Sequence, residues 1–334
     1  MVEDNRLPIT PLNASVNVTA PLDARSVVPL RRPRLSAAEH RRLARNYRLK
    51  KALVAYAFLA PNFIFFVIFL LIPIGWAIFA SLRSGSLIGV QKFVGLKNWG
   101  AVFQDRTAQQ TLQNSLYYGL IAIPCMLILG LIVAFFLRNI KRGGAFFRAG
   151  VYFPVLAPVV VAGLIWVFMV HPDFGALNLI ARAIGGTPIN FLGTTALALP
   201  TIAAVEIWRG VGFWAVYFLA ALIALPTELY QAAHMDGANT WQRFLHLTLP
   251  LLRATILFAV VQATIYNLQI FDTVFVMTDG GPSNSTATVV WYIYRTLFTY
   301  DNIGYGATIS VILLVVILVL ALIEIRLLRG RKVG

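Results

Sequence analysis

Charged side chains are scarce in this sequence, and acidic ones are the scarcest. Of its 334 residues, 12% are charged, with 13 Asp and Glu against 28 Lys and Arg. A soluble chain of this length would be expected to form two domains with charged surfaces. Here 59% of the residues are apolar and the mean hydropathy is +0.75. This composition excludes a soluble protein, and uncharged runs long enough to cross a bilayer indicate a polytopic membrane protein.

Cysteine and histidine are also rare, and neither forms a cluster in the sequence. Because Cys125 is the single cysteine, an intramolecular disulfide is excluded. It lies inside an apolar run, which favours a small buried side chain. The four histidines, at positions 40, 171, 234 and 246, are scattered over loops. We therefore expect no metal site in this chain.

The signatures of catalysis are missing as well. There is no Gly-x-x-x-x-Gly-Lys-Ser/Thr loop, so the chain is not expected to hydrolyse ATP itself. The sequence also lacks the clustered Asp, His or Lys at a membrane face that an enzyme acting on lipid-linked sugars would need. We expect no catalytic residue and no bound cofactor.

Basic residues are concentrated near the N-terminus and beside the apolar runs. Eleven of the 28 Lys and Arg lie in residues 1–51. Although the net charge is +15, this distribution is typical of membrane topology signals, so nucleic acid is not an expected partner. Residues 1–30 lack periodicity and are expected to be disordered, whereas Ser36 to Glu39 has the form of a capping box. Residues 1–50 are thus predicted to be a cytoplasmic tail ending in a basic helix that contacts membrane lipid.

Apolar runs within residues 51–330 predict a domain of six transmembrane helices. They cover approximately 52–82, 112–137, 149–170, 196–225, 251–277 and 302–323. Prolines at positions 61, 73, 124, 154, 158 and 200 predict kinks or span ends. If the N-terminus is cytoplasmic, segments on that side carry 21 Lys and Arg, and the outer loops carry 6. Both termini and the 226–253 loop are therefore expected in the cytoplasm.

The stretch from Glu228 to Pro250 is polar and lies between two long apolar runs. It reads ELYQAAHMDGANTWQRFLHLTLP and predicts a helix, a turn and a second helix. Helix formers precede Asp236 and Gly237, which signal a turn, and Asn239 can cap the helix that follows.

This stretch resembles the EAA loop of the membrane subunits of binding-protein-dependent ABC importers. The order and spacing match those of the carbohydrate type, the maltose-like and glycerol-3-phosphate-like permeases, except that Gln231 replaces the leading Glu of the motif. Glu228 lies one helical turn earlier. The resemblance implies that a loop at 226–250 couples to an ATPase, through residues Glu228, Gln231, Ala232, Ala233, Asp236, Gly237, Ala238 and Phe244. The alternative is an amphipathic connecting helix on the membrane surface.

Other stretches resemble the same family. They include a Gly-Gly-Pro loop between Thr278 and Thr286, and the Gly304-Tyr-Gly-Ala-Thr-Ile-Ser310 string. The resemblance implies an all-α, type I ABC importer permease in the cytoplasmic (inner) membrane. It also implies a second homologous permease subunit, an extracytoplasmic sugar-binding protein and an ATPase subunit dimer, which uses ATP and Mg.

Polar residues in the fifth run suggest a substrate path. Gln262, Tyr266, Gln269 and Thr273 follow Thr255 at spacings that place them in one stripe of a continuous helix. Amides and an aromatic hydroxyl can hydrogen-bond sugar hydroxyls while the ring stacks on a sugar face. The alternative, hydrogen bonding between helices of the bundle, stays open.

Two opposite charges lie inside the fourth run. Glu206 and Arg209 are three residues apart, and an intrahelical pair facing the bundle is the least costly arrangement. They form a structural ion pair or line the path as an internal gate, with Tyr217 near the same face. Asp272, near the outer end of the fifth run, is a weaker gate candidate.

Together these patterns predict the permease subunit of an ATP-driven importer. It would move a disaccharide, an oligosaccharide or a related polyol or sugar derivative by alternating access. The alternative is a stand-alone secondary transporter or channel for a small polar solute, although no inverted repeat is visible in the sequence.

Overall fold

The computed structural model describes residues 37–86, 89–140 and 142–329. The disorder expected for residues 1–30 and the capping role expected for Ser36 lie outside this part of the chain. Packing divides the described residues at Phe66 and Val67 into two units. The division into 1–50 and 51–330 therefore stays a prediction.

The first unit contains α1, which runs from Ala37 to Phe66 and includes Pro61. Its side chains between residues 46 and 66 are mainly large, apolar and exposed; Phe58, for example, is 84% exposed. A helix with these exposed side chains is suited to lipid or to another subunit.

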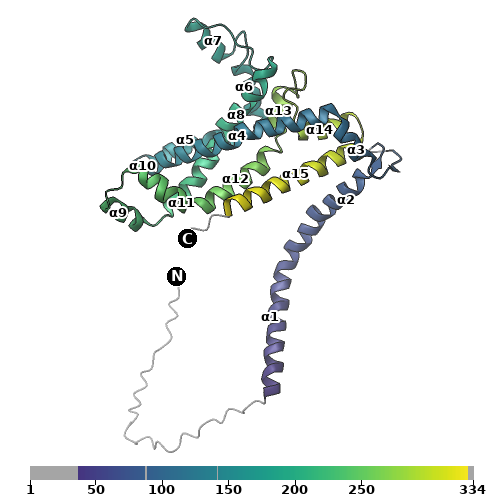
Figure 1. The fold of residues 1–334 in the computed structure, drawn as a ribbon, viewed down its shortest axis with the longest axis vertical. Coiled ribbons are helices and arrows are strands. Elements are labelled where there is room, and N and C mark those ends of the chain that lie inside the picture. The colour runs from purple at the N-terminus through teal and green to yellow at the C-terminus, as the bar shows by residue number, and fades with distance from the viewer. Residues whose placement is uncertain (1–36, 87–88, 141, 330–334) are drawn as a thin grey trace, which may run out of the picture. The chain divides into compact units, whose positions relative to one another are not determined.

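The regular structure in the described part of the second unit is helical except for one pair of two-residue strands, β1 and β2, which the all-α prediction omitted. Figure 1 shows the order of its elements. They are η1 (Val67–Leu71), α2 (Ile72–Ser81), β1 (Arg83–Ser84), β2 (Lys92–Phe93), α3 (Lys97–Gln104), α4 (Arg106–Arg138), α5 (Gly144–Leu156), α6 (Val159–Met169), α7 (Ala176–Ala183), α8 (Thr195–Ile223), α9 (Thr227–Met235), α10 (Thr240–Arg243), η2 (Phe244–Thr248), α11 (Leu249–Leu251), α12 (Arg253–Asn267), α13 (Asp272–Met277), α14 (Val289–Tyr294), η3 (Arg295–Thr299) and α15 (Ile303–Arg329). The η elements are π-helical turns.

Several helices are long and apolar enough to cross a membrane. Within the described residues there are four: Asn46–Ser81, Arg106–Arg138, Thr195–Ile223 and Ile303–Leu327. The number rises to six if two bent pairs are each counted as one span, Gly144–Leu156 with Val159–Met169 and Thr240–Leu251 with Arg253–Asn267. Five of these overlap apolar runs closely, and the pair that includes Arg253–Asn267 overlaps the first part of the fifth run, so the polytopic helical fold is confirmed.

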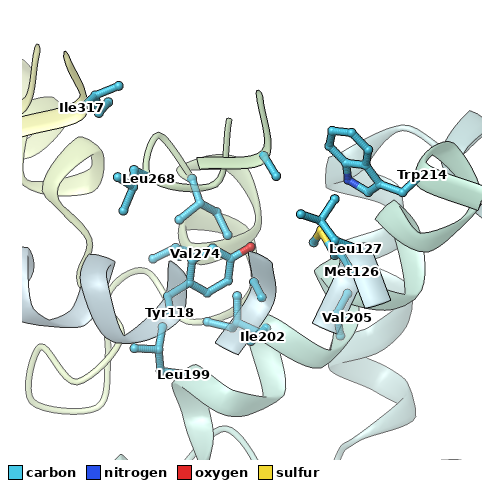
Figure 2. Packing of buried hydrophobic residues seen from close by; sticks show 14 of the residues in the cluster. Tyr118, Met126, Leu127, Leu199, Ile202, Val205, Trp214, Leu268, Val274 and Ile317 are labelled. Carbon is cyan, nitrogen blue, oxygen red and sulfur yellow. The ribbon is translucent and has the colours of Figure 1, made fainter. Parts of the chain in front are cut away.

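The core of the second unit lies where α8 packs against α4 and α5. A Cβ on Gly130 of α4 would lie 2.6 Å from the Trp214 Cβ, and one on Gly212 would lie 2.2 Å from the Val151 carbonyl oxygen. Small residues therefore let these helix backbones approach closely, as is common inside membranes. Figure 2 shows Trp214 beside Met126, and Tyr118 among the aliphatic side chains further along the cluster.

The third span bends by 92° between α5 and α6. Pro158 lies at the N-terminus of α6, and the α5 helix contains Pro154. Because a proline lacks an N–H group and disfavours a helical conformation in the residue before it, the bend follows from the sequence as predicted.

The fifth span is broken, which corrects the continuous helix expected over 251–277. The α12 helix ends at Asn267 and α13 begins at Asp272. Phe271 has φ −138° and ψ −58°, outside helical geometry. The hydroxyl of Thr288 donates to the Ile270 carbonyl oxygen at 2.9 Å. A side chain from outside the helix thus binds a backbone group that the break would leave without an intrahelical partner.

Candidate functional site

The loop of residues 226–250 folds as the helix, turn and helix predicted from its sequence. The α9 helix ends at Met235, and Gly237 follows with φ +77°. The Ala238 N–H donates to the Ala233 carbonyl oxygen at 2.9 Å, and the Gly237 N–H donates to His234 at 3.1 Å. This left-handed glycine closes the helix end and sends the chain in a new direction.

A capping box begins the second helix of the loop. The Gln242 N–H donates to the Asn239 side-chain oxygen at 2.8 Å. In return, the Asn239 N–H donates to the Gln242 side chain at 2.8 Å. The sequence predicted the Asn239 cap, and the reciprocal Gln242 contact makes the turn well defined.

The residues expected to contact an ATPase lie mainly on the outside of this loop. Those exposed are Glu228, Gln231, Ala232, Asp236 and Gly237, while Ala233, Ala238 and Phe244 are half-buried. Two large apolar side chains that the sequence reading did not select are also exposed, Met235 at 86% and Trp241 at 66%. Together they give the loop a surface of small and polar residues flanked by apolar side chains, a composition suited to docking.

The inner side of the loop is tied to the end of α4. The Phe244 ring meets Phe135 edge-on at 5.8 Å and stacks on Trp241 at 5.6 Å. The Arg138 guanidinium lies 4.8 Å from the centre of the Tyr230 ring. A displacement of the loop would therefore act directly on α4, which packs against α8.

One hydrogen bond holds the two ends of the loop together. The Tyr230 hydroxyl lies 3.0 Å from the Thr248 hydroxyl, which is buried and also donates to the Arg243 carbonyl oxygen at 3.3 Å. The sequence reading missed both residues, although a tyrosine between the small residues and the apolar run was a visible signal.

A cavity of about 460 Å³ lies between α4, α5, α8 and the broken fifth span. Seven of the eight residues proposed for a substrate path line it: Glu206, Arg209, Gln262, Tyr266, Gln269, Asp272 and Thr273. The single-stripe geometry behind that prediction is wrong, because Gln269 falls in the break and Thr273 on α13. The break itself turns these side chains into the same cavity.

The eighth residue, Tyr217, lies elsewhere. It lines a second cavity of about 430 Å³ together with Thr255, Phe213 and Tyr152. Its hydroxyl donates to the Thr255 carbonyl oxygen at 3.3 Å. Thr255 is thus separated from the polar residues that the sequence grouped with it.

An ion pair lies in the wall of the first cavity, as the sequence predicted. The Arg209 Nη2 atom is 2.8 Å from Glu206 Oε2, and Thr273 donates a hydrogen bond to Glu206 Oε1. Glu206 is buried, and its charge is balanced by the guanidinium and by the hydroxyl from α13. The pair therefore joins α8 to α13 across the broken span.

Aromatic and amide groups supply most of the remaining polar lining. Tyr266 is 70% exposed, and Gln262 and Gln269 are exposed beside it. Asn267 accepts a hydrogen bond from the Tyr118 hydroxyl at 3.2 Å and also lines the cavity. The sequence reading missed Tyr118 and Trp214, because their places on α4 and α8 look like ordinary core positions.

A second polar cluster joins three helices at the opposite end of the unit from the loop (Figure 1). Tyr292 and Tyr305 both donate to Asp105 Oδ2, at 2.5 and 2.6 Å, and the other oxygen accepts from the Thr107 N–H at 2.8 Å. Burial acts to raise the pKa of Asp105, but these hydrogen bonds outweigh it and hold the pKa below its ordinary value. Burial and the contact with Asp105 raise the pKa of Tyr292, which keeps it a donor.

Comparison with known proteins first identifies a matching family. A family model described as "Binding-protein-dependent transport system inner membrane component" matches residues 126–331. That range contains the loop, the ion pair and the broken span.

Several relatives align with most of the chain. A probable ABC transporter permease, YurN of Bacillus subtilis, is 32% identical over 285 residues, which is 84% of this chain and 97% of YurN. The lactose transport permease LacF of Rhizobium radiobacter is 34% identical, covering 83% of this chain and 94% of LacF. The sn-glycerol-3-phosphate permease UgpA of Agrobacterium fabrum is 32% identical, covering 84% of this chain and 96% of UgpA.

A solved structure has the same fold. It is a crystal structure of a bacterial alginate ABC transporter in complex with an alginate pentasaccharide-bound periplasmic protein. The matched chain superposes with a TM-score of 0.74 at 23% identity, covering 83% of this chain and 94% of that one. At this identity the match establishes the helical arrangement.

Proposed function

The chain belongs to the family of binding-protein-dependent transport system inner membrane components, and we propose that its cavity passes a saccharide or a related polyol. It is a multi-pass inner membrane protein, the non-catalytic permease subunit of an ABC importer. Relatives named for lactose and for sn-glycerol-3-phosphate support a polyhydroxylated cargo.

The cavity at the broken span is the observation that carries this proposal. Its volume of about 460 Å³ is within the range of small-molecule sites. Tyr266 presents a ring and a hydroxyl, and Gln262 and Gln269 offer both donors and acceptors. Such a lining suits a molecule with many hydroxyl groups and an apolar ring face.

The loop of residues 226–250 is proposed as the contact with an ATPase dimer. Its exposed small residues allow close approach, while Phe244 and Tyr230 connect it to α4. The ATPase subunits would bind ATP and Mg, and their closure would shift the loop and the helices that line the cavity. The termini and this loop would then lie in the cytoplasm.

A second permease subunit and an extracytoplasmic binding protein complete the proposed assembly. The exposed apolar side chains of α1 and the exposed ring of Tyr266 in the cavity lining support a neighbouring membrane chain. The alginate transporter complex contains a saccharide-bound periplasmic protein, which supports delivery of the cargo in the same way.

The test is uptake by proteoliposomes that contain the chain with its partner permease, ATPase and binding protein. We expect uptake of a labelled saccharide to need ATP inside, to stop with vanadate and to persist with a proton uncoupler. Uptake that survives vanadate and collapses with the uncoupler would instead identify a stand-alone secondary transporter.

A further inference from the structure

The charges in the wall of the cavity do not balance. Among the described residues that line it, those with a formal charge are Glu206, Arg209 and Asp272. Two are acidic and one is basic, so the number of carboxylates exceeds the number of cations. How these three groups are paired decides which charge a solute meets.

Arg209 is paired with Glu206 and also interacts with the Tyr266 hydroxyl. Its Nη2 and Nε atoms lie 2.8 and 3.4 Å from the two carboxylate oxygens, so both nitrogens are directed at the same partner. The two side chains are 14% and 7% exposed, respectively. A guanidinium held in this way is a poor receptor for a second anion, because binding would have to separate a buried pair.

Asp272 has no such partner among the described residues. It is the first residue of α13, is exposed, and lines the cavity beside Gln269 and Thr273. The break in the fifth span places this residue in the cavity lining. It therefore contributes one negative charge that no cation in the described lining compensates.

We propose that Asp272 is a specificity-determining residue that makes the cavity accept neutral or amine-bearing saccharides and reject acidic ones. This inference rests on the proposed function as a saccharide path. A carboxylate, sulfate or phosphate on the cargo would meet the charge of Asp272 without a free cation to offset it. The rejection is strongest where the cavity excludes water.

The first test measures the electrostatic potential in the cavity and needs no substrate. Cys125→Ala removes the single cysteine, and Gln269→Cys then places a thiol in the lining, three residues from Asp272. The purified complex is treated with a cationic methanethiosulfonate, the ethyltrimethylammonium reagent, and with the anionic ethylsulfonate reagent. The rate with the cationic reagent is divided by the rate with the anionic reagent. This ratio is then divided by the ratio that the same two reagents give with free 2-mercaptoethanol, and the result is the normalised ratio.

We expect the normalised ratio to be about 25 at low salt, since a unit charge about 4 Å away raises the rate of the cationic reagent and lowers that of the anionic reagent by roughly fivefold each in water. Asp272→Asn should bring the ratio close to one, and Asp272→Lys should bring it below one. Asp173→Asn, at an exposed aspartate outside the cavity, is the matched control and should leave it unchanged. A ratio at or below one with Asp272 present, or one unaffected by Asp272→Asn, overturns the proposal.

The second test uses matched cargoes with the same binding protein throughout. ATP-driven uptake is compared for lactose and lactobionate and for maltose and maltobionate, where the second member of each pair carries one carboxylate. We expect the neutral member of each pair to be taken up faster than the acidic member. Asp272→Asn should reduce the ratio of the two uptake rates about fivefold. Faster uptake of the acidic member would contradict the inference. If no saccharide is taken up, the proposed function fails while the thiol test still decides the charge of the cavity.

Discussion

At Gly237 a single backbone conformation decides the direction of the loop. The residue has φ +77°, and apart from the glycine and its two chain neighbours no described atom lies within 4 Å of the position a Cβ would take. Glycine is therefore needed there for its conformation and not for space.

Gly237→Val should strain the turn by about 1–2 kcal/mol, since a β-branched side chain disfavours positive φ. We expect normal insertion with loss of most ATP-driven uptake, measured in proteoliposomes beside the amount of assembled complex. Gly100→Ala, also in open space but without positive φ, is the control. Uptake by Gly237→Val equal to that of the control would argue against a coupling role.

Glu206 and Arg209 form an ion pair that is costly to break from one side. Glu206→Ala leaves a guanidinium without its partner, and the cost for a buried pair is roughly 3–5 kcal/mol. The double variant Glu206→Gln with Arg209→Met removes both charges and should lose clearly less stability. The unfolding temperatures of the single and the double variant are compared in detergent. Equal decreases would show that the pairing of the two charges contributes little to stability.

At the scale of elements, the broken fifth span depends on a residue from outside it. Thr288→Val removes the hydroxyl that donates to the Ile270 carbonyl oxygen while keeping the side chain's shape. We expect a loss of about 1–2 kcal/mol, because the carbonyl is left without that donor.

Thr111→Val is the matched control for this change, since both threonines are fully buried. The Thr111 hydroxyl donates to the Ala108 carbonyl oxygen within the α4 helix, which is not at a break. Its unfolding temperature in detergent should fall less than that of Thr288→Val. If the unfolding temperatures of the two variants fall by the same amount, the hydroxyl at the break has no special role.

The contrast between the loop and the fifth span explains what the sequence could predict. The turn at Gly237 and the cap at Asn239 are set by local chemistry, and the pair of Glu206 and Arg209 by helical spacing, so each was readable. The break after Asn267 was not, because residues 254–277 contain neither Pro nor Gly and are strongly apolar. Its partner, Thr288, lies 18 residues from Ile270, and only tertiary packing brings them together.

At the scale of the whole molecule, Asp105 links α4, α14 and α15 through one carboxylate. Its pKa is held below the ordinary value of 3.8, so ionisation stabilises the folded state. This contribution is fully present above the ordinary pKa and is lost as the pH falls through the lower pKa of the folded protein.

Asp105→Asn should therefore lower the unfolding temperature in detergent by a constant amount between pH 5 and 7. Below about pH 4 the difference from the unmodified protein should shrink, as its own carboxylate becomes protonated. Asp173→Asn, at an exposed aspartate, is the reference. A difference that stays constant down to pH 3 would contradict this account.

The wide π-helical turn at Phe244–Thr248 limits how many residues this segment of the chain can gain or lose. Such a turn accommodates one inserted residue within a helix. Deleting that residue would restore the α-helical ladder but rotate the loop relative to α12 by about 100°. Trp241 and Met235 would then face a different side. Insertions or deletions of one residue here should thus be rare among relatives, and a chain that acquired one would need an ATPase whose docking surface had rotated with it.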